Sequence, residues 1–386
     1  MTDASNTPLK TTPLHGLHVR LGARMAEFGG YDMPIQYADG IMAEHTWTRS
    51  HAGLFDVSHM GPSFLSLPQL GGGDEAHRKV AAIVERLVPS DISGLAPGKV
   101  QLTVLLDANG GIIDDLMIGR PLRADQQGML YIVVNAGTKE NDFALIAEAA
   151  GMEAELHRAD ERALVAIQGP EAEAVIAGIL PEAVPLTFMT FCEIRNTAFG
   201  NIIATRCGYT GEDGFEILLP AEHGEAFANR LLEDPRVKSI GLGARDSLRL
   251  EGGMCLYGHD IDISKTPVAA SLSWMISKAR RERGDFPGAG RILRELKQGV
   301  PSKRVGIRPL GRAPAREGAE IQNTDGETIG VITSGGFGPT VNGPVAQGYV
   351  DATYAKAGTP VKLIVRGKAL EAEVATLPFV PAKYKR

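Results

Sequence analysis

The sequence predicts an α+β body followed by a small all-β C-terminal domain. The chain has 386 residues, of which 44% are hydrophobic and 22% are charged, and this length and composition suit two or three globular domains. Up to residue 251, strand-like and helix-like segments follow one another without the regular βαβ period of a doubly wound sheet. After Lys303, short β-prone runs recur between Gly, Pro and Asn turns, which is typical of a barrel or sandwich.

Apolar periodicity and turn residues place the individual elements. Segment 14–37 reads as a short strand with loops, and segment 278–290 reads as a linker because charged residues are followed by Gly and Pro. The predicted helices lie at 40–53, 76–87, 138–150, 171–180, 222–232 and 243–251. The predicted strands lie at 54–60, 99–107, 112–119, 129–134, 163–167, 201–210 and 215–219, and in the C-terminal part at 304–307, 328–333, 346–350, 360–365 and 370–375.

The hairpin at 99–119 carries two adjacent acids. Asn109 and Gly110 supply the positive φ angles of a tight turn, so a strand is expected on either side. Side chains alternate along a strand, and Asp114 and Asp115 should therefore point to opposite faces and should not act as a close pair. The acid on the buried face needs a partner. Two interpretations stay open: a sheet-edge acid that faces water, or an acid held in an apolar pocket for proton chemistry.

Glu216 is a second candidate carboxylate. It alternates with Phe215 and Ile217 in the predicted strand 215–219, so it should face away from them. Taken singly, such an acid is most often part of a surface ion pair.

Cysteine and histidine spacing gives no sign of a metal site. The three cysteines are odd in number and widely spaced, which argues against a disulfide framework and against a thiolate zinc site. The histidines at 45, 51 and 59 match no standard metal-ligand spacing. We therefore expect no metal.

Charge and hydropathy suggest a soluble cytoplasmic protein. The net charge of −6 gives no reason to expect binding to nucleic acid or to an anionic membrane. Residues 1–15 lack the apolar stretch of a secretory signal, and no apolar run approaches the ~20 residues that span a bilayer. The basic run 278–283 is either a solvated face or an attractor for a polyanionic ligand tail or acidic partner.

A set of segments, in this order, carries a resemblance to a known family. They are 53–60 (GLFDVSHM), 110–116 (GGIIDDL), 131–135 (YIVVN), 208–216 (GYTGEDGFE), 244–251 (ARDSLRLE), 255–258 (CLYG), 271–274 (SLSW), 285–288 (DFPG) and 333–335 (TSG). Set out so, the chain closely resembles the folate-binding T-proteins of the glycine cleavage system, which are aminomethyltransferases. The resemblance runs from about His15 to Tyr384.

The resemblance implies a fold and a division into domains. The family fold is a three-domain cloverleaf around a central folate site, with a C-terminal β-barrel. On this chain it implies a first α+β domain at 1–55 plus 138–240 and a second at 56–137 plus 241–285, which encloses the folate site. The barrel domain is then expected at 286–386.

The resemblance also implies the site residues. The essential aspartate of the family falls on Asp115, the second acid of the hairpin. The positions implied for folate are Met60, Tyr131, Asn135, Tyr209, Glu216, Arg245 and Trp274, with Arg304 and Tyr384 near the folate tail and the transfer site. These residue types suit a folate, because a carboxylate can pair with the pterin edge, aromatic rings can stack, and arginines bind carboxylates in a bidentate manner.

The implied reaction is transfer of the methylene of an aminomethyl group from the lipoyl arm of H-protein to tetrahydrofolate as co-substrate. The expected products are 5,10-methylenetetrahydrofolate, ammonia and the dihydrolipoyl arm. Two alternatives stay open: another folate-dependent demethylase or methyltransferase on the same scaffold, and a non-enzymatic folate-binding protein. The presence of Asp115 favours an enzyme.

Overall fold

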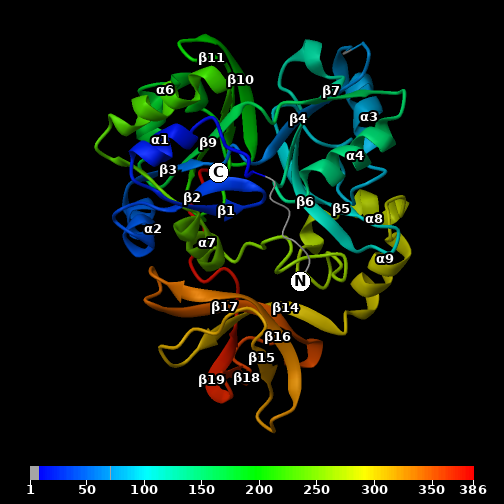
Figure 1. Ribbon diagram of the computed structural model, residues 1–386. Coiled ribbons are helices and arrows are strands. Elements are labelled where there is room, and N and C mark those ends of the chain that lie inside the picture. The colour runs from blue at the N-terminus through cyan, green and yellow to red at the C-terminus, as the bar shows by residue number, and fades with distance from the viewer. Residues whose placement is uncertain (1–7, 70) are drawn as a thin grey trace.

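The computed structural model describes residues 8–69 and 71–386, which form three lobes: two helix-covered sheets and a closed barrel (Figure 1). The predicted α+β fold with a C-terminal β-barrel is confirmed. Residues 1–7, part of the segment searched above for a signal, lie outside the described residues. In the described part of the chain, no helix is both long and apolar enough to cross a membrane.

The first sheet has six strands in the order β10-β11-β12-β9-β3-β13, antiparallel except for the pair β3–β13. Its strands are β3 (Ala52–Asp56), β9 (Ala163–Gln168), β10 (Thr190–Thr197), β11 (Gly200–Arg206), β12 (Gly214–Leu219) and β13 (Val237–Ser239). One face packs on α5 (Ala172–Ala177) and α6 (Ala221–Leu232) through Val165, Ile217 and Phe227. Alternate residues of the same strands face the other way.

The second sheet has five antiparallel strands in the order β5-β6-β7-β4-β8. They are β4 (Gly61–Ser66), β5 (Val100–Leu106), β6 (Ile112–Gly119), β7 (Met129–Val134) and β8 (Glu155–Arg158). Helices α3 (Gly73–Val84) and α4 (Lys139–Ala150) cover one face, where Ile83, Leu116 and Ile146 belong to one core. The predicted hairpin is therefore confirmed as β5 and β6.

A third apolar core joins the two sheets and positions the site. It contains Leu164 and Leu218 of the first sheet and Val133 of the second. Ala244 and Leu248 of helix α7 (Leu242–Glu251) complete it. Polar side chains on these same strand faces are consequently brought toward one another from both sheets and from α7.

The sequence prediction omits strands β4, β8, β10 and β13 of the two sheets, and two further segments differ from it in kind. Segment 14–37 contains a short helix, α1 (His15–Arg20), before the hairpin of β1 (Arg24–Phe28) and β2 (Tyr31–Gln36). The predicted linker at 278–290 is wrong, because α8 (Lys278–Arg283) is a helix and is followed by α9 (Ala289–Gln298). The remaining α-helix of the described residues is α2 (Ile41–Ser50), and 3-10 turns occur at η1 (Ala124–Gln126), η2 (Pro181–Ala183), η3 (Ser273–Met275) and η4 (Ala352–Tyr354).

The C-terminal lobe is a closed barrel in the order β14-β17-β16-β15-β18-β19. Its strands are β14 (Ser302–Pro309), β15 (Glu320–Gln322), β16 (Thr328–Gly338), β17 (Gly343–Asp351), β18 (Pro360–Val365) and β19 (Lys368–Ala375). Ile307, Leu363 and Val374 lie in its interior. Closure leaves no free strand edge among these strands.

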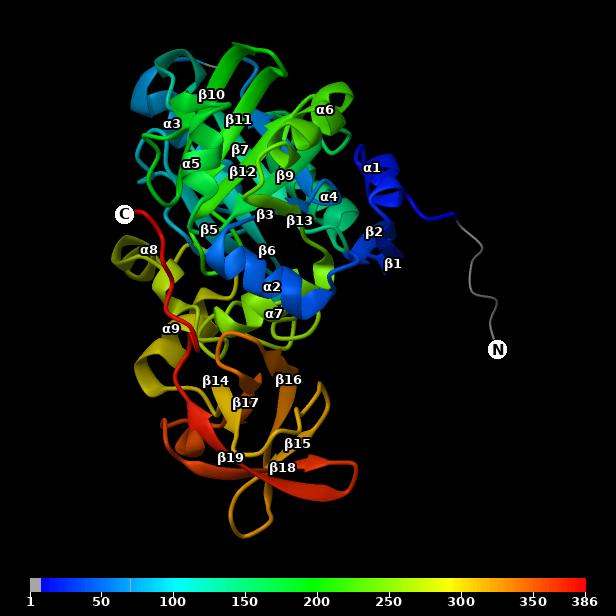
Figure 2. The same cartoon turned by 90° about the vertical axis from the view of Figure 1, so that its left-hand side faces the viewer.

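The C-terminal segment 377–386 leaves the barrel and runs back to the body of the molecule (Figure 2). The backbone N–H groups of Phe379 and Val380 donate to the carbonyl of Glu251, at the end of α7. Further on, the ring of Tyr384 stacks on Phe188, with centroids 3.8 Å apart. The ammonium of Lys385 then donates to Glu173 on α5 at 2.7 Å.

Candidate functional site

The predicted site residues Asp115, Tyr209, Glu216 and Arg245 converge between the two sheets and α7. Each keeps some exposed surface, and yet burial is the largest influence on the pKa of each one. These side chains are thus enclosed by protein while still open to solvent. They come from β6, the loop after β11, β12 and α7.

Asp114 and Asp115 point to opposite faces of β6, as strand alternation predicts. Asp114 is fully buried on the face that carries Leu116 and Ile118, whereas Asp115 is only half-buried on the other face. The interpretation of both acids as water-facing edge residues is therefore excluded for Asp114. The buried position requires partners for its charge.

Asn135 connects the two acids around the end of β7. Its side-chain Nδ2 donates to Oδ1 of Asp114 at 2.9 Å and to Oδ1 of Asp115 at 3.0 Å. It also lies 3.0 Å from the carbonyl oxygen of Asp115. Because all three neighbours are acceptors, the amide orientation is fixed with the nitrogen toward them. Sequence reasoning separated the two acids, but the structure joins them through this amide.

The environment of Asp115 brings the titration of its carboxyl close to neutral pH. Burial, followed by the Asp114 carboxylate, raises the pKa of Asp115 to about 7, and the hydrogen bond from Asn135 works in the opposite direction. A carboxyl group with such a pKa can both accept and release a proton at neutral pH. This supports the second interpretation of the hairpin acids, an acid kept in a pocket for proton chemistry.

Glu216 and Arg245 form the opposite side of the site. Glu216 faces away from Phe215 and Ile217, as predicted, and the Cys207 thiol lies on its side of the strand, where it lowers the pKa of Glu216. Burial raises the pKa of Glu216, while the charge of Arg245 acts against that rise. The Arg245 guanidinium lies 4.8 Å from the ring centroid of Tyr209.

Hydrogen-bonding capacity remains unused at this side. Within the part of the chain that the structure describes, the guanidinium of Arg245 feels the charge of Glu216 but has no acceptor in hydrogen-bond position. Tyr209 is held from its far end, because its hydroxyl donates to the carbonyl of Cys255. The ring face of Tyr209 is therefore fixed while the charged groups stay available to a ligand.

Met60 and Tyr131 supply apolar surface next to these groups. Both belong to the core between the sheets, where the Tyr131 ring lies 5.7 Å from Phe191. Burial raises the pKa of Tyr131, and the charge of Glu216 adds to it, which places the two side chains near one another. Tyr131 itself is only 4% exposed, so its packed ring forms a fixed wall beside these groups.

The remaining predicted residues differ from this cluster in their exposure and their contacts. Trp274, in η3, is 59% exposed. Arg304 is buried in β14, and its guanidinium donates to the carbonyls of Ala270 and Gly253 and to the side chain of Gln347. Tyr384 lies on the C-terminal segment against Phe188.

Asp142 is a residue of this region that sequence reasoning missed. It lies on α4, is fully buried, and its carboxyl faces that of Asp114. Burial and then the facing acid raise the pKa of Asp142 to about 9. One signal was available: Asp142 stands four residues before Ile146, on the stripe that also carries Phe143, where an acid breaks the apolar pattern.

One residue of the basic run 278–283 is packed into the protein, whereas Lys278, Arg281 and Arg283 are exposed. Arg280 is 1% exposed, and its guanidinium donates to Glu85 at 3.0 Å and to Asp285 at 2.8 Å. Arg281 donates to the carbonyls of Ile276 and Ser273. Both open interpretations of this run, the solvated face and the attractor for an anion, are therefore wrong for Arg280.

His45 and His51 of the sequence analysis have hydrogen-bond partners, whereas Nδ1 of the buried His59 has none among the described residues. His45 is buried between α2 and α7, where Nε2 lies 3.0 Å from Glu251 and Nδ1 lies 2.7 Å from Ser247. Over residues 8–69 and 71–386, no group of three or more His, Cys, Asp or Glu side chains could hold a metal ion.

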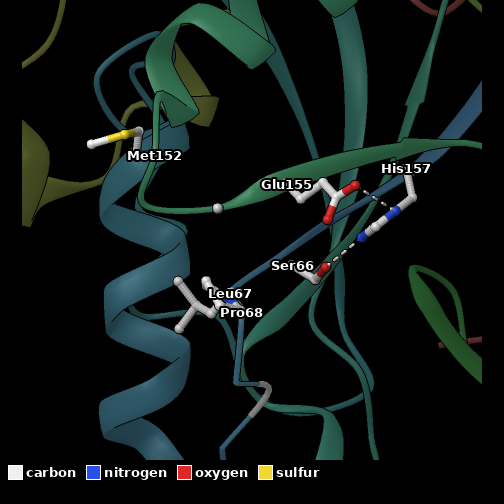
Figure 3. A pocket seen from close by; sticks show the side chains of 7 residues that line it. Ser66, Leu67, Pro68, Met152, Glu155 and His157 are labelled. Atoms are coloured by element: carbon white, nitrogen blue, oxygen red, sulfur yellow. Dashed lines mark hydrogen bonds and ion pairs between the residues drawn. The ribbon is translucent and has the colours of Figure 1, made fainter.

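A surface hollow of about 470 Å³ lies elsewhere, between the end of β4 and the start of β8 (Figure 3). There Ser66 lies 3.0 Å from Nε2 of His157, and Glu155 lies 3.7 Å from Nδ1. In space, these three side chains are arranged like a Ser-His-acid triad. The Glu155 carboxylate, however, is beyond hydrogen-bond distance of His157 and is 76% exposed. This hollow carries no catalytic geometry.

Comparisons with known proteins cover nearly the whole chain. Residues 14–280 match the GCVT N-terminal domain, and residues 303–381 match the glycine cleavage T-protein C-terminal barrel domain. The chain is 43% identical to a mitochondrial aminomethyltransferase of Flaveria anomala, covering 99% of this chain and 92% of that one. It is 42% identical to a probable mitochondrial aminomethyltransferase of Schizosaccharomyces pombe, covering 99% and 95%.

A solved structure agrees with the sequence relatives. The crystal structure of glycine cleavage system aminomethyltransferase T from Bartonella henselae superposes with a TM-score of 0.88 at 41% identity, covering 98% of this chain and 100% of that chain. The resemblance found in the motifs thus extends through both sheets and the barrel. The chain belongs to the glycine cleavage T-protein family.

Proposed function

We propose that the chain is an aminomethyltransferase that moves the methylene of an aminomethyl-lipoyl H-protein to tetrahydrofolate, giving 5,10-methylenetetrahydrofolate, ammonia and the dihydrolipoyl protein. Its relatives over the full length are named aminomethyltransferases. The observation that carries the proposal is Asp115, an enclosed carboxyl with a pKa raised to about 7 by burial and by Asp114. This group stands opposite a carboxylate and a guanidinium that have hydrogen-bonding capacity left for a ligand.

The donor set fits a folate. The carboxylate of Glu216 can accept two hydrogen bonds from a pterin edge, and Arg245 can bind carbonyl or carboxylate oxygens. Tyr209 and Met60 offer flat or apolar contact for a ring. When bound, tetrahydrofolate supplies the nitrogen that takes up the one-carbon unit.

Asp115 is the proposed catalytic residue. In its ionised form it orients and accepts a proton from the attacking nitrogen, and in its protonated form it returns a proton to the leaving amine. Such proton transfer is worth about 10²–10⁴-fold in rate. Asn135 holds one oxygen of Asp115, so the other oxygen is left for the substrate.

The outlying residues take proposed roles at the rim. Trp274, Arg304 and Tyr384 stay predictions for the folate tail and the transfer site, and Arg304 would act with the part of its guanidinium that its three protein contacts leave over. The domain boundaries at 55, 137, 240 and 285 likewise stay a proposal. The expectation that the protein binds no metal, no nucleic acid and no membrane also stays a proposal.

We also propose the cytoplasm as the compartment. Cys192, Cys207 and Cys255 are free thiols, as expected in a reducing environment. The Flaveria and Schizosaccharomyces relatives are named as mitochondrial, so a mitochondrial location is the competing outcome. Fractionation of cells that produce the chain decides between them.

The decisive experiment supplies aminomethylated lipoyl H-protein and tetrahydrofolate and measures methylenetetrahydrofolate and ammonia. The expected result is equal formation of both products by the unmodified chain and none above background with Asp115→Asn. No product from the unmodified chain would overturn the proposal. Turnover of methylated amines or sulfonium compounds in place of H-protein would instead support a folate-dependent demethylase.

A further inference from the structure

The fully buried acids Asp114 and Asp142 face each other behind the site, and their partners differ. Asp114 accepts hydrogen bonds from Nδ2 of Asn135 at 2.9 Å, from the hydroxyl of Thr138 at 2.7 Å and from the backbone N–H of Asn135 at 3.3 Å. In the described residues, neither oxygen of Asp142 has a donor in hydrogen-bond position. Two carboxylates, both without contact to water, cannot both be ionised at such close range without a large cost.

The different partners decide which acid holds the proton. Three donors in hydrogen-bond position stabilise a negative charge on Asp114. The side chains of Thr138 and Asn141 lie near Asp142 but outside hydrogen-bond position, and they lower its pKa less than burial and Asp114 raise it. Protonation of Asp142 also satisfies one of its two unpartnered oxygens, because that oxygen becomes a hydroxyl donor and Asp114 is the adjacent acceptor. The pair then carries a single negative charge.

We propose that Asp142 is a positioning residue that stays protonated at neutral pH and donates to Asp114, so that the pair holds the amide of Asn135 and, through it, the carboxyl of Asp115. The chain of contacts runs from α4 to β6, then to the end of β7, and back to β6. Asp142 touches no reacting atom. It fixes the orientation of Asp115 and keeps one negative charge, not two, beside it.

Three other titratable groups near the network, Tyr257, Tyr209 and Cys255, are neutral at physiological pH because burial raises the pKa of each. Burial, followed by the charges of Asp114 and Asp142, raises the pKa of Tyr257 to about 12. On the side of Asp115, burial raises the pKa of Tyr209 and raises that of Cys255 to about 12. The charge that Asp115 meets is therefore set by the Asp114–Asp142 pair.

The first test needs neither folate nor H-protein. The infrared spectrum of the folded chain at pH 8 should contain the carbonyl band of a protonated carboxylic acid, and Asp142→Asn should remove it while Asp115→Asn should leave it. Burial and Asp114 raise the pKa of Asp142 to about 9, so the band should fade as the pH passes that value. An identical acid band in the unmodified chain and in Asp142→Asn would overturn the proposal.

The second test rests on the proposed function and uses the H-protein assay. Asp142→Asn keeps both the volume and a donor toward Asp114, whereas Asp142→Leu removes the donor. We expect Asp142→Leu to lose on the order of tenfold to hundredfold in kcat, with an unchanged Kd for tetrahydrofolate, and Asp142→Asn to restore the rate. Equal loss in both variants would refute a positioning role.

The two tests separate the two ways of failing. If the unmodified chain makes no methylenetetrahydrofolate, the proposed function fails, and the infrared comparison still decides where the proton lies. If Asp142→Leu does not fold, the comparison of Asp142→Asn with the unmodified chain keeps the proposal open to refutation. Asp114→Asn adds a further check, because removal of its charge should move the acidic limb of the pH–rate profile to lower pH.

Discussion

Replacing Asp115 by Asn should stabilise the protein while it removes activity. Asn has the shape of Asp and keeps the Oδ1 acceptor for the amide of Asn135, which lies 3.0 Å away. It lacks the charge that burial and Asp114 disfavour. The substitution therefore removes a cost that the folded protein carries only when Asp115 is ionised.

The structure gives the sign and the size of the effect. The pKa of Asp115 is raised from 3.8 to about 7, so the folded state binds its proton more tightly than the unfolded state does. Between these two values the folded state holds more protons, and the free energy of unfolding of the unmodified chain falls as the pH rises. At about 1.36 kcal/mol for each pKa unit, the advantage of Asp115→Asn should grow by about 2–3 kcal/mol between pH 5 and pH 8.

Equilibrium urea unfolding of both chains at pH 5 and pH 8 measures this advantage. Asp325→Asn, which removes an exposed carboxylate in a turn of the barrel, is the control for loss of one charge. An advantage of Asp115→Asn that is constant with pH, or that shrinks toward pH 8, would refute the reasoning. It would mean that Asp115 is ionised in the folded protein at little cost.

Three further outcomes are expected. In the H-protein assay, Asp115→Asn should lower kcat by about 10²–10⁴-fold with folate binding retained, and Asp114→Asn should be milder; equal losses would contradict the assignment of faces. Glu216→Ala should raise the Kd for tetrahydrofolate by about tenfold to hundredfold, measured by calorimetry, since a hydrogen bond to a charged group is worth about 1.5–3 kcal/mol; an unchanged Kd would remove Glu216 from the pterin site. Arg280→Leu should cost about 1–3 kcal/mol of unfolding free energy, because the buried carbonyls of Glu85 and Val88 lose their donor and the Glu85 carboxylate keeps only the exposed Arg283 as a cation; Lys278→Ala, at a 91% exposed side chain, should change nothing measurable.

Strand geometry could be predicted from the sequence because it depends on the backbone alone. The period of two placed Asp114 and Asp115 on opposite faces and turned Glu216 away from its apolar neighbours, and all of this is observed. Which acid does the chemistry did not follow from the pattern. That choice came from the family resemblance, and the raised pKa of Asp115, caused by burial and by Asp114, now gives it a physical basis.

Contacts between distant segments could not be predicted in this way. The burial of Arg280 within an otherwise exposed basic run could not be predicted, because composition does not show that Glu85, 195 residues earlier, lies beside it in the fold. Asn135 joins two acids that strand alternation separates, because it reaches around a strand end. Helix α1 has six residues, which is too short for a helical period to stand out.

The C-terminal segment gives the barrel a second attachment to the body. One connection is the chain that runs from α9 into β14, and the other is the segment in which Tyr384 stacks on Phe188 and Lys385 binds Glu173. A domain joined by a single linker is free to swing, whereas one held along two lines is not. The barrel should therefore keep a fixed position relative to the two sheets, and substrate binding should not require a swing of this domain.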